Sequence, residues 1–267
     1  MRLAIWDSSP ADFLVSGFTS GAVDNPFAIE RHAPAACAGR FARGEADVAL
    51  LPTVVALQVA ESIDVVPSVG LVSWRYPFAR LAWNDGLNNL PQTVAFNPND
   101  VQERFLARVL LQEHYGESSE FVPYSEHAPR DLLETDEDAT LLVGPNVPTL
   151  QVDGFSMDLG REWYELANYP MVWGLVCAHE GKLASEHIEA LIACAEASEE
   201  HRDMWVQSQE PPAALDAFYH DDLRLRLDRL AIASLTEFRK YLFYYDVFDD
   251  IPDIPFAYLP DVKEKED

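Results

Sequence analysis

Apolar runs of strand length alternate in the first part of the chain with segments whose apolar residues recur every three or four positions. Residues 3–6 and 48–51 are unbroken apolar runs, as expected for strands buried on both faces. Residues 35–43, between them, have a helical pattern with a basic last turn, and Gly44 follows where helices commonly end. This alternation predicts a parallel sheet with covering helices, and therefore an α/β fold.

The same pattern starts again in the middle of the chain. Residues 93–96 and 139–143 have strand character, and residues 101–115 form an amphipathic helical pattern. Extended segments at 79–83 and 170–178 are placed to cross between the two halves. We therefore predict two α/β lobes joined by two crossing strands, with a ligand cleft between the lobes.

The lobe boundaries follow from these crossings. One lobe is expected to be discontinuous and to contain residues 1–82 and 179–267, and the other is expected to contain residues 83–178. The periodicity of the last third is helical, at residues 185–203, 211–219 and 222–245, so the C-terminal part is expected to be helical.

The charge of the chain restricts its partners. Forty-five acidic residues against 19 basic ones give a net charge of −26, which disfavours binding to nucleic acids and to anionic membranes. Two interpretations remain open: a surface adapted to high salt, or an ordinary acidic protein with an acidic tail. An anionic small molecule would have to meet local cations or helix N-termini.

The location expected from the sequence is the cytoplasm. No apolar run approaches the roughly 20 residues that span a bilayer, and the apolar segment after Arg2 is interrupted by Asp7, too early for a secretory signal. The oligomeric state is left open.

No motif indicates a metal or an organic cofactor. The three cysteines lack ligand spacing and are expected to be buried free thiols. The histidines, also without ligand spacing, are expected to be surface or satisfied residues; they are His32, His114, His127, His179, His187, His201 and His220. The common glycine-rich nucleotide motifs and the G-x-S-x-G motif are absent from the sequence.

Polar residues gather where the predicted strands end, at the edge of a parallel sheet where ligands bind. We assign Asp7 and Ser73 as candidate catalytic residues. The candidate substrate-binding residues are Ser8, Ser9, Thr53, Arg75, Arg80, Asn97, Asn99, Gln102, Gly144 and Asn146. For each of them a turn, a helix cap or a structural ion pair is the alternative role.

Three sets of residues resemble the menaquinone biosynthesis family of the futalosine pathway. They are the segment 43–53 with 66–73, the segment 107–116 with 138–144, and the segment 158–163 with Tyr169 and Pro170. The resemblance covers about two-thirds of the chain, to about residue 180. It implies a periplasmic-binding-protein-like fold without metal or organic cofactor. Residues 47–52 are closer to chorismate dehydratase, which converts chorismate to 3-enolpyruvylbenzoate, than to the sister enzyme acting on cyclic dehypoxanthine futalosine.

The sequence departs from this family at three places. Asp7 stands where the family has Asn, Arg80 where it has Ser, and residues 99–102 where it has a Ser-Arg-Thr-Ser-like helix start. The resemblance implies a cytoplasmic carbon–oxygen lyase acting on a chorismate-like anion. The departures keep two alternatives open: the sister lyase, and a non-catalytic small-anion-binding protein with the same fold.

Overall fold

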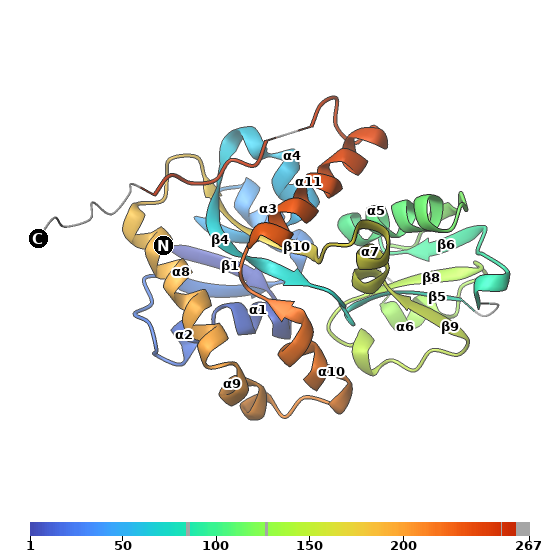
Figure 1. Cartoon of the computed structure of the whole chain (residues 1–267), viewed down its shortest axis with the longest axis horizontal. Coiled ribbons are helices and arrows are strands. Elements are labelled where there is room, and N and C mark those ends of the chain that lie inside the picture. Colours follow the sequence, from blue (N-terminus) through green and yellow to red (C-terminus); the bar gives the residue numbers. More distant parts are fainter. Residues whose placement is uncertain (84–85, 126–127, 252, 260–267) are drawn as a thin grey trace, which may run out of the picture.

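The computed structural model describes residues 1–83, 86–125, 128–251 and 253–259. His127 and parts of the expected acidic tail, residues 252 and 260–267, lie outside the described residues. Within the described part, two sheets with their own helices lie side by side (Figure 1). The predicted α/β class with two parts therefore agrees with the observed architecture.

The larger sheet has six strands in the order β11-β4-β10-β3-β1-β2. β1 is parallel to β2 and β3, whereas β10 lies antiparallel between β3 and β4. The strand bounds are β1 Arg2–Trp6, β2 Ala28–His32, β3 Val48–Pro52, β4 Ile63–Ser73, β10 Met171–His179 and β11 Leu223–Arg224.

The smaller sheet has five strands in the order β7-β6-β8-β5-β9. β6 is parallel to β7 and β8, and β5 runs antiparallel to β8 and β9. The strand bounds are β5 Ala79–Trp83, β6 Thr93–Phe96, β7 Glu120–Pro123, β8 Ala139–Val143 and β9 Phe155–Asp158.

Helices pack on both sheets (Figure 1). Those of the larger sheet are α1 Ser9–Leu14, α2 Ser16–Thr19, α3 Pro34–Ala42, α4 Thr53–Gln58, α8 Ser185–Glu200, α9 Arg202–Gln209, α10 Ala213–Ala217 and α11 Arg229–Tyr244. Those of the smaller sheet are α5 Val101–Val109, α6 Pro129–Leu132 and α7 Leu159–Ala167. The 3-10 turns are η1 Ala60–Ser62, η2 Gly86–Asn88 and η4 Val147–Thr149, and the π-helical turns are η3 Leu110–His114 and η5 Phe218–Asp222.

The helix-to-strand junction before β3 follows the sequence pattern closely. α3 ends at Ala42, and Gly44 has a φ of +69°, a conformation open to glycine because it has no Cβ. β3 is fully buried from Val48 to Leu51, and α4 begins directly after it. The polar end of β3 is thereby fixed at the edge of the larger sheet.

The strand pairing corrects both expected lobe boundaries. β5 lies wholly in the smaller sheet, so residues 79–82 belong with that sheet and not with the larger one as expected. β10 lies wholly in the larger sheet, so residues 171–178 belong with that sheet and not with the smaller one. β10 is apolar along its length because it is covered on both faces in a central position. The connections between the sheets are residues 74–78 and 159–170 instead.

β4 runs from Ile63 to Ser73 through Pro67 and Ser68, whose φ is +65°, and its pairing with β10 is irregular there. One further expectation is wrong in detail. Residues 223–228 are not helical: β11 pairs with the end of β4, and α11 starts after the N-cap Asp228. The three cysteines are buried and free, as predicted.

Candidate functional site

The carboxyl ends of the strands in the two sheets lie at edges that the connecting segments join (Figure 1). In the larger sheet, Ser73 at the end of β4 pairs with Met171 at the start of β10. In the smaller sheet, Asp158 at the end of β9 pairs with Arg80 near the start of β5. We call these two edges the facing edges. Ligands of α/β proteins bind outside such strand ends, so the facing edges form the candidate site.

Thr53 and Ser73 lie at the facing edge of the larger sheet, and both are fully buried. The Thr53 hydroxyl donates to the carbonyl oxygen of Val172 at 2.7 Å, and Ser73 Oγ accepts from Trp173 Nε1 at 2.8 Å. Both side chains therefore hold the start of β10 in place.

Gln102 connects the two parts of the molecule. It is 1% exposed, its Nε2 donates to the Trp173 carbonyl at 2.8 Å, and its Oε1 accepts from the Val54 amide at 3.1 Å. One side chain from the first turn of α5 thus satisfies backbone groups of β10 and α4. Its role in this conformation is to join the facing edges.

Asp7, Ser8 and Ser9 follow β1 at the same edge. The Asp7 side chain is exposed, and its amide donates to the His32 carbonyl at 2.8 Å. Ser8 Oγ is buried without a hydrogen-bond partner among the described residues. Ser9 Oγ accepts from the Tyr219 hydroxyl, whose pKa is raised to about 12, mainly by burial. Tyr219 therefore remains a neutral donor at physiological pH.

Arg75 and Arg80 differ in how far they are neutralised. Arg75 Nη2 lies 2.6 Å from Asp222 Oδ2, and this hydrogen bond raises the pKa of the guanidinium. Arg80 is half-buried and makes no ion pair with the described residues. Its strand neighbour Asp158 accepts from the Tyr76 amide at 2.8 Å, and burial raises the pKa of that carboxyl. The charge of Arg80 acts on that carboxyl in the opposite sense, and Arg80 is the less neutralised of the two arginines.

The remaining predicted residues lie in the loops after β6 and β8. Asn97 Oδ1 accepts from the Asn99 amide at 3.0 Å, which closes a turn before α5. Gly144 has a φ of +135°, and its amide donates to the Phe78 carbonyl at 2.9 Å. Asn99 and Asn146 are exposed. The structure places these four residues at the facing edge of the smaller sheet, where the sequence predicted them.

The sequence interpretation missed a pair of carboxyl groups at the start of α5. Asp100 is the N-cap without a side-chain capping bond, and Glu103 lies in the first turn. Burial raises the pKa of Asp100 to about 8 and that of Glu103 to about 7, and the neighbouring charge of Glu103 adds to the shift of Asp100. Two acids three residues apart at a helix start normally indicate only capping. What distinguishes this pair is its burial, which the sequence pattern does not indicate.

Aromatic rings pack on Trp173 of β10. Tyr76 stacks on Trp173 with ring centroids 4.0 Å apart and contacts Phe218 edge-on at 6.1 Å. Burial raises the pKa of Tyr76, and the charges of Glu103 and Tyr219 add to that shift. Glu103 is therefore close enough for its charge to act on Tyr76.

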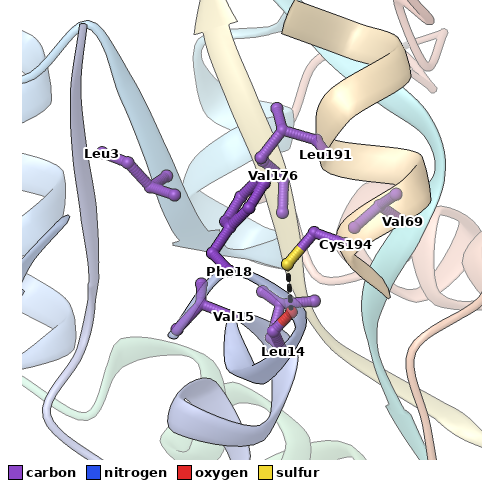
Figure 2. A pocket seen from close by; sticks show the side chains of 8 residues that line it. All are labelled: Leu3, Leu14, Val15, Phe18, Val69, Val176, Leu191 and Cys194. Atoms are coloured by element: carbon purple, nitrogen blue, oxygen red, sulfur yellow. Dashed lines mark hydrogen bonds between the residues drawn. The ribbon is translucent and has the colours of Figure 1, made fainter. Parts of the chain in front are cut away.

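Two cavities lie away from the facing edges. One has a volume of about 10 Å³ and is lined by apolar side chains. Figure 2 shows these side chains with Cys194, whose Sγ donates to the Leu14 carbonyl at 3.5 Å. This volume barely reaches that of one water molecule. A cavity of about 300 Å³ lies beside Asp138, whose carboxylate accepts from the amides of Gln92 and Thr93 at the amino end of β6. Neither cavity contains a predicted site residue.

Sequence comparison connects the chain with one family. A family model described as menaquinone biosynthesis matches residues 1–244. The match extends through most of the C-terminal part, beyond the segments whose sequence carried the resemblance. A search of curated proteins finds no match.

Structure comparison finds similar folds at low sequence identity. A protein from Archaeoglobus fulgidus is 15% identical, with a TM-score of 0.65 over 92% of this chain and 98% of its own. The periplasmic aliphatic sulphonate binding protein SsuA from Escherichia coli is 14% identical, with a TM-score of 0.64 over 97% and 92%. A Candida albicans protein described as having the generic periplasmic binding protein fold is 12% identical, with a TM-score of 0.58 over 96% and 92%. The predicted periplasmic-binding-protein-like fold is confirmed.

The helices give no indication of a membrane span. Among the described residues, none of them combines the length and apolar character needed to cross a bilayer.

Proposed function

We propose, from the premise that the chain belongs to the menaquinone biosynthesis family, that it is a chorismate dehydratase-like lyase forming 3-enolpyruvylbenzoate. The family match over residues 1–244 is the observation that carries this proposal. It is supported by the facing edges, which hold polar groups from both sheets at the position where this fold class binds ligands.

The reaction requires two proton transfers, and the protein must hold a substrate that carries two negative charges. Elimination of water breaks one ring C–H bond and the C–O bond of the ring hydroxyl, so a base takes a proton and an acid protonates the leaving oxygen. Both substrate carboxylates must be held still, because orientation supplies a large part of such a rate enhancement.

We assign the acid to the Asp100–Glu103 carboxyl pair. Burial keeps a proton on this pair near neutral pH, and a group with a pKa near the working pH is the most effective general acid. Protonation also removes the repulsion that an ionised pair would exert on an anionic substrate.

We assign the base to Asp7 and the principal anion contact to Arg80. Asp7 offers an exposed carboxylate at the tip of β1, and Arg80 offers a guanidinium without an ion-pair partner among the described residues. Ser73 acts through Trp173, which it positions by the hydrogen bond at 2.8 Å. Opening of the facing edges admits the substrate, as in hinge closure of related binding proteins.

The direct test is incubation of the purified protein with chorismate at low and high salt, with chromatographic detection of 3-enolpyruvylbenzoate. We expect product, a loss of about 10²-fold or more in kcat for Glu103→Gln, and a raised KM for Arg80→Gln. Asp153→Asn removes a charge from an exposed loop residue and should leave both constants unchanged. A folded protein that yields no product at either salt concentration contradicts the proposal.

The similarity to SsuA favours one second candidate, a non-catalytic protein that binds small anions. Thermal stabilisation by chorismate without turnover would support it. The same assay with cyclic dehypoxanthine futalosine separates the sister lyase from both.

A further inference from the structure

A histidine and two glutamates from distant parts of the sequence meet in the smaller part of the molecule. His114 is the last residue of η3, and Glu162 and Glu165 lie one helical turn apart on α7. One possible ligand atom from each side chain lies within 4.8 Å of the others. Among the described residues, this is the group of three His, Cys, Asp or Glu side chains whose ligand atoms are close enough together to hold a metal ion.

We infer that His114, Glu162 and Glu165 bind a divalent transition-metal ion, with Zn²⁺ as the best match. An imidazole nitrogen with two carboxylate oxygens is a set that zinc accepts in tetrahedral sites, whereas calcium and magnesium prefer oxygen ligands alone. A water molecule would supply the fourth ligand.

The hydrogen bonds of the three side chains leave ligand atoms available. Glu162 accepts from the Tyr115 hydroxyl through Oε2, and Glu165 accepts from Arg161 through Oε1 at 3.0 Å. His114 makes a ring contact with Tyr115 but no hydrogen bond within the described part of the chain. Each residue thus retains a free oxygen or nitrogen.

Glu162 is the fixed ligand of the set. It is 7% exposed, and the Tyr115 hydroxyl orients its carboxylate. A protein group that holds a ligand carboxylate in this way is the usual outer-shell partner of a metal site.

The other two ligands have room to adjust. Tetrahedral zinc with ligand bonds of about 2.0–2.2 Å separates its ligand atoms by about 3.3 Å, so the present spacing must shorten. Glu165 is exposed and His114 is half-buried, and side-chain rotation of both can close the gap. The Arg161–Glu165 ion pair, with side chains 66% and 42% exposed, opposes this only weakly.

The experiment measures binding of Zn²⁺ to chelator-treated full-length protein by equilibrium dialysis and calorimetry, and the visible absorption of Co²⁺ in its place. We expect one tight site per chain and intense Co²⁺ bands of tetrahedral type. His114→Ala and Glu165→Gln should each weaken Zn²⁺ binding by about 10-fold or more, and Tyr115→Phe by about 10- to 100-fold.

A second histidine with two acidic neighbours provides the control. His220 Nδ1 lies 3.3 Å from Asp203 Oδ1, and its Nε2 lies 3.7 Å from Asp216 Oδ1, so both of its nitrogens are already engaged. His220→Ala should bind Zn²⁺ like the unaltered chain. Absence of a tight site, or equal affinity in His114→Ala and His220→Ala, overturns the inference; the latter result would mean that the acidic surface binds zinc non-specifically. This readout is independent of lyase activity.

Discussion

Replacing Glu103 by Gln should change how the stability of the protein depends on pH. The pKa of Glu103 rises from 4.5 in the unfolded chain to about 7 in the fold, and that of Asp100 from 3.8 to about 8. The folded state therefore binds more protons than the unfolded state between about pH 4 and 8. Because stability falls with pH wherever the folded state holds the extra protons, this pair should destabilise the protein progressively as the pH rises through that window.

The magnitude follows from the size of the shift. The rise in the pKa of Glu103 from 4.5 to about 7 corresponds, at about 1.4 kcal/mol for each tenfold change in proton affinity, to about 3 kcal/mol. Because both side chains retain some exposure to solvent, we take this as the upper limit of the effect. Glu103→Gln removes one titrating group and also the neighbouring charge that raises the pKa of Asp100.

The assay is urea unfolding, followed by tryptophan fluorescence, at pH 5, 6, 7 and 8 and constant ionic strength. The free energy of unfolding of Glu103→Gln minus that of the unaltered chain should increase by up to about 3 kcal/mol from pH 5 to pH 8. The same difference for Asp153→Asn, an exposed loop residue, should stay constant. Parallel pH curves for Glu103→Gln and the unaltered chain would refute the reasoning.

Two further substitutions test the packing around β10. Gln102→Ala leaves the Val54 amide and the Trp173 carbonyl without their partner, and should cost about 1–3 kcal/mol in chemical unfolding; an unchanged midpoint would mean that water replaces the side chain. Gly174→Ala would place a Cβ 2.8 Å from a Trp6 ring carbon and 2.9 Å from Leu50 Cδ1, and should also cost about 1–3 kcal/mol. Gly39→Ala within α3, which meets only the end of a flexible Arg side chain, should instead gain up to about 1 kcal/mol, and a loss similar to that of Gly174→Ala would contradict the packing argument.

Local features of the fold were predictable because their causes are local. The end of α3, the glycine at position 44 and the buried strand β3 each depend on neighbours within a few residues. The sheet to which β10 belongs depends on strands about 100 residues away in the sequence. An apolar run alone does not indicate with which strand it will pair. That is why both expected lobe boundaries were displaced.

The candidate site was predictable in position but not in chemistry. Thr53 and Ser73 do lie at strand ends, but their hydroxyls are engaged by β10. The indole of Trp173 is a hydrogen-bond donor that a hydropathy pattern treats as apolar. The Asp100–Glu103 pair and the group around His114 were missed because burial and tertiary proximity, on which both depend, leave no spacing signal in the sequence.

The position of β10 also determines how the chain can fold during synthesis. This strand lies between β3 and β4, yet it follows them by about 100 residues, and the three side chains that hold its first residues are 71, 100 and 119 positions away. Until residue 179 has left the ribosome, β3 and β4 cannot pair with their shared neighbour. They therefore expose apolar strand edges during this time. Such edges are templates for aggregation, so the nascent chain passes through a vulnerable interval that ends when its central strand inserts.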